Sequence, residues 1–310
     1  MYDFHLNSFD AKQYLSNNPD LVDSGITTPS KAWKHWVNYG INEGRTCNKR
    51  ISNFEKKDSG IILFTNARDE LRIKEWCLHH LNIGFDNIYI FDHLSIEPLE
   101  DVLYNFDKRV TTIRVKKKNE IKYNCIDYAI FLSKQLNAKW MLYLDCDEFL
   151  VLNEHNNVSD FINSYENADM ISLNWLFFGT NGYITEPEGS IISNYTKSDL
   201  ILNNHVKTFV KPDKIQSVNT PHSYHLIPGS MAYDSKRNKI NSPGPFININ
   251  CEYYNVIAYI AHYYYQSEET YFKRKNLKTD IGCIRSIETN IHEIGNSHFN
   301  DSIKIKYSLP

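Results

Sequence analysis

Acidic side chains follow an apolar segment in the middle of the chain, in the order Asp145-Cys146-Asp147-Glu148. The preceding residues 140–144 are apolar, and a carboxylate at the end of such a buried strand must be solvated, hydrogen-bonded or bound to a cation. On an extended backbone Asp145 and Asp147 point to the same side. Two converging carboxylates suit Mg²⁺ or Mn²⁺ carrying a diphosphate, and a solvated turn is the equal alternative.

A metal ion held by two carboxylates and a diphosphate can take a further protein ligand, and histidine is a common one for Mn²⁺. The chain has 12 His, so chance placement near the acids is a competing explanation. His262 ends an apolar segment and precedes a basic, helix-like segment, which makes it the first choice, and His222 is the runner-up. We therefore expect Mn²⁺ or Mg²⁺ on Asp145, Asp147 and His262.

The elements that must position these residues alternate between strand-like and helix-like patterns from Gly60 onward. The expected strands are residues 61–65, 87–91, 110–115 and 140–144, with helices at 69–83, 99–106 and 121–136, followed by strands at 170–178, 206–210, 215–218 and 255–265 and a helix at 267–275. This order predicts an α/β fold, a Rossmann-like and mostly parallel sheet flanked by helices. Ligands of such sheets bind beyond the carboxyl ends of the strands, so several candidate residues share one rim.

Two other strand ends on that rim carry polar side chains. Asp92 follows the second strand, where an acid often binds a ribose hydroxyl or a base. Asn66, Arg68 and Glu70 follow the first strand, and an arginine there could grip a phosphate in bidentate fashion. The alternative for each charged residue is an ordinary salt bridge in a loop.

The overall charge is close to balanced, with 34 basic and 37 acidic side chains among 310 residues. This gives no electrostatic reason to expect a nucleic acid or an anionic membrane as partner. The local basic run of residues 116–118 with Lys122 is best explained as a solvated face, with phosphate contact as the minority alternative.

Membrane insertion and secretion are not expected from the sequence. No segment reaches the roughly 18 apolar residues that span a bilayer, and no signal pattern opens the chain. The six Cys include no Cys-x-x-Cys pair, which predicts reduced thiols in a cytoplasmic protein. Heavy use of Asn, Ile, Lys and Tyr hints at a bacterial or viral origin.

Three regions can be distinguished by composition. Residues 1–50 have apolar side chains at helical spacing around a Pro19 break and predict a small helical accessory module, too small to form a full core alone. Residues 51–59 are polar and predict a linker, and residues 60–310 form the main domain. The module has two competing roles: docking a protein partner, or covering an apolar edge of the main domain.

Five blocks of sequence, in the same order, resemble the family 2-like and family 92-like glycosyltransferases of the GT-A fold. The blocks lie at residues 66–92, 140–150, 174–182, 205–212 and 261–275, so that the resemblance covers roughly residues 60–280. The segment at residues 14–45 also looks like a small helical module found beside glycosyltransferase domains.

The resemblance implies a nucleotide-sugar donor, a divalent metal on Asp145 and Asp147, and a histidine, here His262, that completes the site. It also implies inversion at the anomeric carbon, with a carboxylate deprotonating the acceptor hydroxyl. The acid-plus-arginine pair that we associate with the group is absent around residues 190–195, so the base is unassigned. Its candidates are Glu186, Glu188 and Asp199.

We therefore expect a metal-dependent, inverting glycosyltransferase that uses a UDP-sugar and a glycan, glycoprotein or lipid-linked acceptor. The base of the donor would lie near Asn66, Glu70 and Asp92. Positive charge for the leaving diphosphate would come from Lys207, Lys211, Lys273 or Arg274. We expect the acceptor platform to consist of Trp175, Phe178 and the loop at 179–182. Two alternatives remain: a Mg²⁺-dependent phosphohydrolase or nucleotidyltransferase, and a non-catalytic protein that binds sugar nucleotides or glycans.

Overall fold

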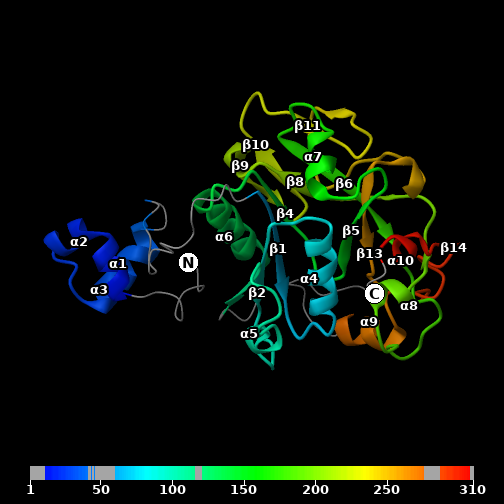
Figure 1. Cartoon of the computed structure of the whole chain (residues 1–310), viewed down its shortest axis with the longest axis horizontal. Helices are drawn as coiled ribbons and strands as arrows, with labels where there is room; N and C mark the ends of the chain where they lie inside the picture. The colour runs from blue at the N-terminus through cyan, green and yellow to red at the C-terminus, as the bar shows by residue number, and fades with distance from the viewer. Residues whose placement is uncertain are drawn as a thin grey trace.

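The main body of the protein is an α/β structure built on a large, mostly parallel sheet. The computed structural model describes residues 11–40, 43, 45, 60–115, 121–275 and 287–307. Ten strands form the sheet, in the order β12-β11-β6-β8-β4-β1-β2-β3, while β13 pairs with β6 and β5 (Figure 1). The predicted fold class is confirmed.

The parallel part of the sheet comes from the first half of the main body, as the alternating sequence pattern predicts. Its strands are β1 (Ile61–Ala67), β2 (Asn87–Asp92), β3 (Val110–Arg114) and β4 (Trp140–Tyr143), and its helices are α4 (Ile73–Asn82), α5 (Leu99–Val102) and α6 (Lys122–Gln135). β1 pairs in parallel with β2 on one side and with β4 on the other. The carboxyl ends of these strands therefore meet at one edge.

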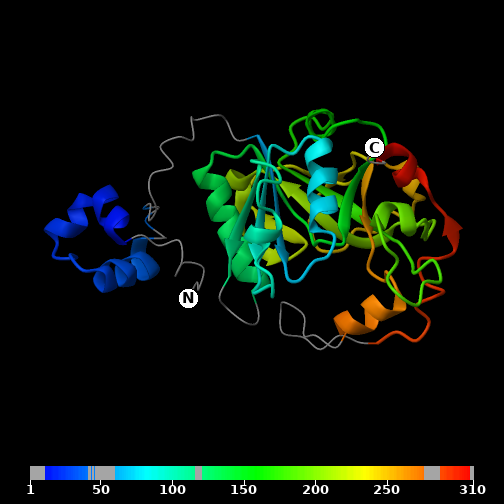
Figure 2. The same cartoon turned by 60° about the horizontal axis from the view of Figure 1, so that its bottom comes forward.

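Alternate residues of β1 enter two separate cores, one on each face of the sheet. Leu63 packs into a cluster with Trp76 of α4, whereas Phe64 packs into a cluster with Ile126 of α6. Successive side chains of a strand point to opposite faces, so a strand covered on both faces is apolar throughout. The two helices consequently lie on opposite faces of the sheet (Figure 2).

The second half extends the sheet with an antiparallel strand. Its elements are β5 (Glu148–Leu152), α7 (Val158–Asn163), β6 (Met170–Phe177), α8 (Ile191–Asn194), β7 (Lys197–Ser198), β8 (Asn203–Val210), η2 (Pro212–Lys214), β9 (Ile215–Thr220), β10 (Ser223–Leu226), β11 (Ala232–Tyr233), β12 (Lys239–Ile240), η3 (Tyr253–Asn255), β13 (Ala258–His262), α9 (Glu268–Lys275), β14 (His298–Phe299) and α10 (Ser302–Tyr307). β8 runs antiparallel to both of its neighbours, β4 and β6. The sequence pattern did not reveal β5 as a strand of its own.

Three short helices precede the main body: α1 (Ala11–Asn17), α2 (Pro19–Asp23) and α3 (Pro29–His35), continued by a π-helical turn, η1 (Trp36–Gly40). Their small core consists of Tyr14, Leu21, Ala32 and Trp36, and Phe131 of α6 packs against it. The helical character of this region is confirmed. The predicted linker 51–59 lies outside the described residues, and the domain boundary and the protein partner stay predictions.

The cysteines at positions 77, 125, 146 and 251 are free thiols, and Cys47 and Cys283 lie outside the described residues. The compartment and the origin of the protein stay predictions. Within the part of the chain that the structure describes, no helix combines the length and the apolar character needed to cross a membrane.

Candidate active site

The acidic residues lie in a tight turn between β4 and β5, at the carboxyl edge of the parallel strands. The backbone N–H of Asp145 donates to Glu148 Oε2 at 2.7 Å, and the N–H of Glu148 donates to the Asp145 carbonyl at 3.1 Å. Because residues 146 and 147 form a turn, the expectation of an extended backbone with both aspartates pointing the same way is wrong. Asp145 and Asp147 instead have different cationic partners.

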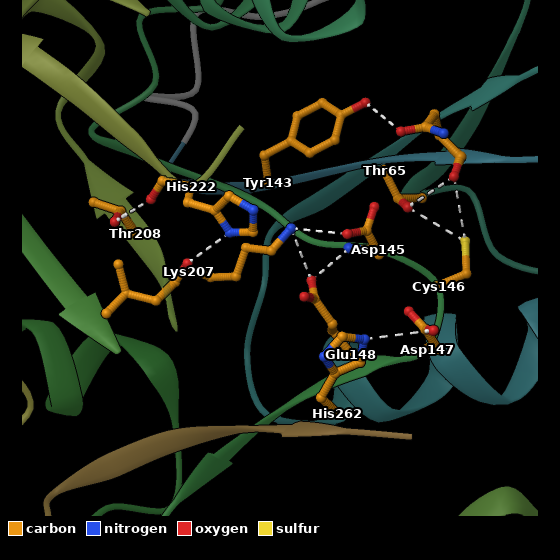
Figure 3. Close-up of polar contacts among 12 residues, drawn as sticks. Thr65, Tyr143, Asp145, Cys146, Asp147, Glu148, Lys207, Thr208, His222 and His262 are labelled. Atoms are coloured by element: carbon orange, nitrogen blue, oxygen red, sulfur yellow. Dashed lines mark hydrogen bonds and ion pairs between the residues drawn. The ribbon is translucent and has the colours of Figure 1, made fainter. Parts of the chain in front are cut away.

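Asp145 is held between two lysines from distant parts of the chain, and Figure 3 shows one of them, Lys207. Lys207 Nζ lies 2.9 Å from Asp145 Oδ2 and 3.1 Å from Glu148 Oε2, and Lys122 pairs with the other oxygen of Asp145. Lys122 Nζ also donates to Asn66 Oδ1 at 2.9 Å. Lys207 is 1% exposed and Glu148 is fully buried, so these charges have little water to solvate them.

Burial and ion pairing act against each other in this group. Burial alone would raise the pKa of Asp145, but Lys122 and Lys207 outweigh it and hold that pKa well below its usual range. Burial alone would lower the pKa of Lys207, but Asp145 and Glu148 outweigh it and raise the pKa. Burial raises the pKa of Glu148 to about 7 against the opposing effect of Lys207. At neutral pH Asp145 and Lys207 are therefore charged, whereas Glu148 is close to half protonated.

Lys122 reaches the site because it is the first residue of α6. A helix that connects two parallel strands runs opposite to them, so its N-terminus lies at their carboxyl edge. Lys122 is 6% exposed, and the interpretation as part of a solvated face is wrong. Residues 116–118 of the same basic run lie outside the described residues. The position of Lys122 at a predicted helix start was the signal that could have identified it.

Asp147 lies against a histidine and an arginine from the C-terminal part of the domain. Antiparallel pairing of β13 with β5 sets His262 opposite Glu148, and His262 Nε2 is 3.5 Å from Asp147 Oδ2. Arg274 of α9 donates from Nη2 to the same oxygen at 2.5 Å. Burial alone would raise the pKa of Asp147, but Arg274 and His262 outweigh it and lower the pKa. Asp147 is therefore ionised at neutral pH.

The donor chemistry of Asp147 and His262 fits a divalent cation. A carboxylate oxygen and an imidazole nitrogen, both buried and aimed at one another, are ligand types that Mn²⁺ accepts. Asp145 is paired with Lys122 and Lys207 instead. Among the described residues no three His, Cys, Asp or Glu side chains converge on one point. The structure thus brings together two of the three predicted metal ligands, and further ligands would have to come from Asp145 after rearrangement or from a bound diphosphate.

The residues predicted on the first strand end lie at the same edge. Asn66 is buried, and its Oδ1 accepts from Lys122 and from the Tyr143 hydroxyl at 3.0 Å. Arg68 and Glu70 are exposed, and Glu70 is close enough to Arg274 to raise its pKa, together with Asp147 and against the effect of burial. Contact of these residues with a nucleotide stays a prediction.

Asp92 has a structural role that the sequence did not indicate. The carboxylate is 2% exposed and accepts from the backbone N–H of Ser95 at 2.9 Å and of Leu99 at 3.1 Å, and it also pairs with Arg114. These bonds stabilise the loop between β2 and α5. The oxygens of Asp92 are thus bonded to protein donors, and its contact with a ribose or a base stays a prediction.

Lys211 lies at the wrong end of the sheet for a role in the site. It pairs with Asp169 at 3.1 Å and its Nζ lies 5.4 Å from the centre of the Trp140 ring, at the start of β4. Four residues of extended β8 separate it from Lys207, which is about 13 Å. On α9, Lys273 is exposed, whereas its neighbour Arg274 contacts Asp147. Of the four cations predicted for the leaving diphosphate, Lys207 and Arg274 therefore lie at the acidic turn, and Lys211 and Lys273 do not contact it.

The runner-up histidine lies on the lysine side of the site (Figure 3). His222 hydrogen-bonds through Nδ1 to the Val206 carbonyl at 3.0 Å, and its ring centre is 5.1 Å from that of Trp175. Burial, reinforced by Lys207, lowers the pKa of His222 to about 3, so the ring is neutral. His262, which faces Asp147 directly, has the better position for a metal ligand.

The two rings expected in the acceptor platform are buried, and contact of this region with an acceptor stays a prediction. Phe178 is fully buried in the core and Trp175 is 8% exposed, so neither ring offers a broad face to solvent. The exposed aromatic side chain beside the site is Phe246, which is 60% exposed. Its ring packs against His205 at 4.6 Å between centres, and His205 in turn stacks on Trp175 at 4.8 Å. The sequence pattern around Phe246 contained no signal for this placement.

The three candidates for the base have different surroundings. Glu186 forms an ion pair with Arg72 at 2.5 Å and accepts a hydrogen bond from the Thr270 hydroxyl at 2.7 Å. The bond to Thr270 connects the loop before α8 to α9. Glu188 is exposed on that same loop. Asp199 accepts a backbone N–H at 3.1 Å, and burial raises its pKa. Within the described part of the chain, none of the three is hydrogen-bonded or ion-paired to the acidic turn, and the base stays unassigned.

Comparison with known proteins identifies the family to which this chain belongs. The model of glycosyltransferase family 92 matches residues 62–280, well over half of the chain. The chain belongs to glycosyltransferase family 92. A family 92 protein of Ricinus communis is 26% identical over 230 residues, which cover 70% of this chain and 39% of that relative. A family 92 protein of Oryza sativa is 24% identical over 183 residues, which cover 57% and 31%. The chain therefore matches well under half the length of either family 92 relative.

Among solved structures, this family 92 chain is similar to HddC from Yersinia pseudotuberculosis, with a TM-score of 0.35 and 11% identity over 62% of this chain and 94% of that one. It is also similar to residues 1–349 of TarS from S. aureus, with a TM-score of 0.33 and 14% identity over 49% and 47%.

Proposed function

We propose that this family 92 chain is a metal-dependent glycosyltransferase that takes a sugar from a nucleoside-diphosphate sugar, with UDP-sugars favoured. It transfers the sugar with inversion to a hydroxyl group of a glycan, a glycoprotein or a lipid-linked acceptor. The main support for the proposal is that each aspartate of the acidic turn lies between two basic side chains at the carboxyl edge of the sheet. Asp145 lies between Lys122 and Lys207, and Asp147 lies between His262 and Arg274.

The cations of this arrangement suit a leaving diphosphate. The acceptor oxygen attacks the anomeric carbon, and the bond from that carbon to the β-phosphate oxygen breaks with its electron pair, so negative charge grows on the diphosphate. Lys207 and Arg274 carry donors that can turn from the carboxylates to phosphate oxygens, because ammonium and guanidinium groups bind both. Charges already held in place stabilise the transition state without reorganising solvent.

A divalent ion, when bound, would act as a Lewis acid that offsets the charge of the leaving diphosphate. Asp147 and His262 would hold it, with Mn²⁺ favoured over Mg²⁺ because one ligand is an imidazole. Asp145 would keep Lys122 and Lys207 in place beside it. The proton of the acceptor hydroxyl passes to a base among Glu186, Glu188 and Asp199, or to another group on the acceptor side.

Donor hydrolysis tests the proposal directly and separates it from the two alternatives. Purified protein is incubated with a panel of nucleotide sugars, with Mn²⁺, with Mg²⁺ or with EDTA, and the products are quantified. Release of UDP from a UDP-sugar that stops with EDTA supports the transferase. Release of inorganic phosphate would support the phosphohydrolase, and binding without turnover would support the non-catalytic protein; either result contradicts the proposal.

Arg274 and Lys273 offer a matched pair on the same helix turn. Arg274→Gln is expected to lower kcat/KM for donor turnover about tenfold or more, since a charge-assisted hydrogen bond to the leaving group is lost. Lys273→Gln removes the same charge from an exposed neighbour and is expected to change kcat/KM by no more than about twofold. Equal losses in the two variants, measured at constant ionic strength, would contradict a direct role of Arg274.

A further inference from the structure

A concave region lies apart from the acidic turn, between the hairpin β9–β10 and the short pair β11–β12; β9, β10 and β11 are at the top of Figure 1. This groove has a volume of about 750 Å³, which is within the range of ligand sites in proteins. None of the residues discussed so far for the donor or the metal lines it. The groove therefore needs an explanation of its own.

The lining of the groove is mostly neutral and includes one histidine, His225. Apolar and aromatic side chains form part of the wall; Tyr224 and Ala232 are buried and Ile227 is exposed. Amide and hydroxyl side chains complete it, including Asn219, Ser230 and Asn241, and the lining contains no Asp, Glu, Lys or Arg. Such groups donate and accept hydrogen bonds without charge. A neutral, hydroxyl-rich ligand matches this surface better than an anion does.

One hydroxyl of the groove lacks a partner. The Oγ of Ser230 is buried, and no described residue of the chain forms a hydrogen bond with it. Buried polar atoms are nearly always hydrogen-bonded, so an exception calls for a bound water or a ligand. Ser230 is one of the residues that line the groove.

The hairpin that forms one wall of the groove also reaches the candidate active site. At its turn, the carbonyl of His222 accepts from the Thr208 hydroxyl at 2.7 Å, and His222 Nδ1 bonds to the Val206 carbonyl. Lys207 lies between Val206 and Thr208 on β8 and is the partner of Asp145. One end of the hairpin thus lies at the acidic turn, while its strands line the groove.

The opposite wall reaches the same part of β8. Residues 241–244 line the groove, and the chain then runs directly to Pro245, whose carbonyl accepts from the Val206 N–H at 3.2 Å. The next residue, Phe246, forms a bridge with His205 and exposes its ring beside the site. Both walls of the groove therefore converge on residues 205–208, with an exposed aromatic ring on the way. Aromatic faces pack well on the apolar faces of sugar rings.

We propose that this groove binds the non-reacting part of the acceptor, a neutral oligosaccharide that runs from the groove past Phe246 to the acidic turn. The inference rests on the proposed function only in calling this ligand the acceptor. A long neutral glycan is bound by the groove and by the active site together, whereas a monosaccharide contacts the active site alone. The proposal therefore predicts that the protein binds longer neutral acceptors more tightly than short ones.

The test uses the whole chain and a tryptophan that fills the groove. Ser217 is exposed on β9 and lines the groove, so Ser217→Trp occupies its volume. Lys239→Trp is the matched control, because Lys239 is exposed on β12 and does not line the groove. Binding is measured on a panel of immobilised neutral and anionic oligosaccharides of graded length. We expect wild type and Lys239→Trp to bind the longer neutral members, and Ser217→Trp to bind them about tenfold or more weakly.

Donor hydrolysis without acceptor is measured in parallel and separates the two proposals. It is expected to be unchanged in Ser217→Trp, because the donor residues are not in the groove. If wild type releases no UDP, the proposed function fails, and the binding panel still decides whether the groove takes a neutral glycan. The groove proposal is overturned if wild type binds no neutral oligosaccharide, if it binds only anionic ones, or if Ser217→Trp and wild type bind equally well.

Discussion

Asp147→Asn is expected to abolish the metal-dependent binding of a nucleoside diphosphate while leaving the protein folded. The substitution keeps the shape of the side chain and removes the charge that faces His262 and Arg274. Saturating UDP with Mn²⁺ should stabilise the wild type by about 3 kcal/mol at about 100 times Kd, which raises Tm by about 5 °C or more. In the variant, the difference between Tm with Mn²⁺ and Tm with EDTA should disappear.

Asp169→Asn is the matched control for this experiment. Asp169 is also a partly buried aspartate paired with a cation, Lys211, but it lies at the other end of the sheet. Loss of the Asp169 charge should lower Tm but leave the difference between Tm with Mn²⁺ and Tm with EDTA unchanged. If Asp147→Asn kept the full increment, the assignment of Asp147 as a metal ligand would be wrong, whatever happened in the control.

Lys207→Met is expected to reduce donor turnover about a hundredfold or more. Its ammonium group is buried and contacts both Asp145 and Glu148, and loss of one preorganised donor in a buried site typically costs that much in kcat. The same change leaves Glu148 without its cationic partner, and removing one member of a buried ion pair costs about 3 kcal/mol or more of stability. Kinetics of UDP release and urea unfolding measure the two effects.

A double variant separates stability from catalysis. Glu148→Gln with Lys207→Met removes both the cation and one buried acid, and Asp145 keeps Lys122 as its partner. We expect the double variant to be more stable than Lys207→Met alone, because no carboxylate is left buried without a partner, and to remain as inactive. Recovery of turnover together with stability would show that Lys207 acts only through folding, and the assigned role of Lys207 in charge stabilisation would be wrong.

The local parts of this fold could be predicted because each depends on neighbouring residues. Apolar runs of strand length and helical spacing located β1, α4, β2, β3, α6 and β4 to within a few residues, apart from a later start of α4. The alternation of strand-like and helix-like segments also placed residues 66–70 and the acidic turn at the same edge of the sheet. By contrast, β5 was missed, because the turn that separates it from β4 consists of the same acidic residues that looked like the end of one strand.

Interactions across the sheet could not be predicted in the same way. The neighbour of a side chain on another strand depends on strand order and register, which long-range packing decides. Antiparallel β8 between β4 and β6 brings Lys207 to Asp145 and carries Lys211 to the opposite edge. Asp92 appeared equivalent to other strand-end acids in the sequence, but the loop after β2 folds back and occupies its oxygens.

The sequence by itself determined the class of fold, the edge on which polar residues gather, and the position of the acidic turn, since periodicity and strand ends are local properties. It also singled out His262. Only the tertiary structure decided which partner each aspartate has: pairing of β13 with β5 sets His262 beside Asp147, the start of α6 brings Lys122 to Asp145, and α9 supplies Arg274. These partners come from segments more than 20 residues away along the chain, so their meeting depends on packing of the whole domain.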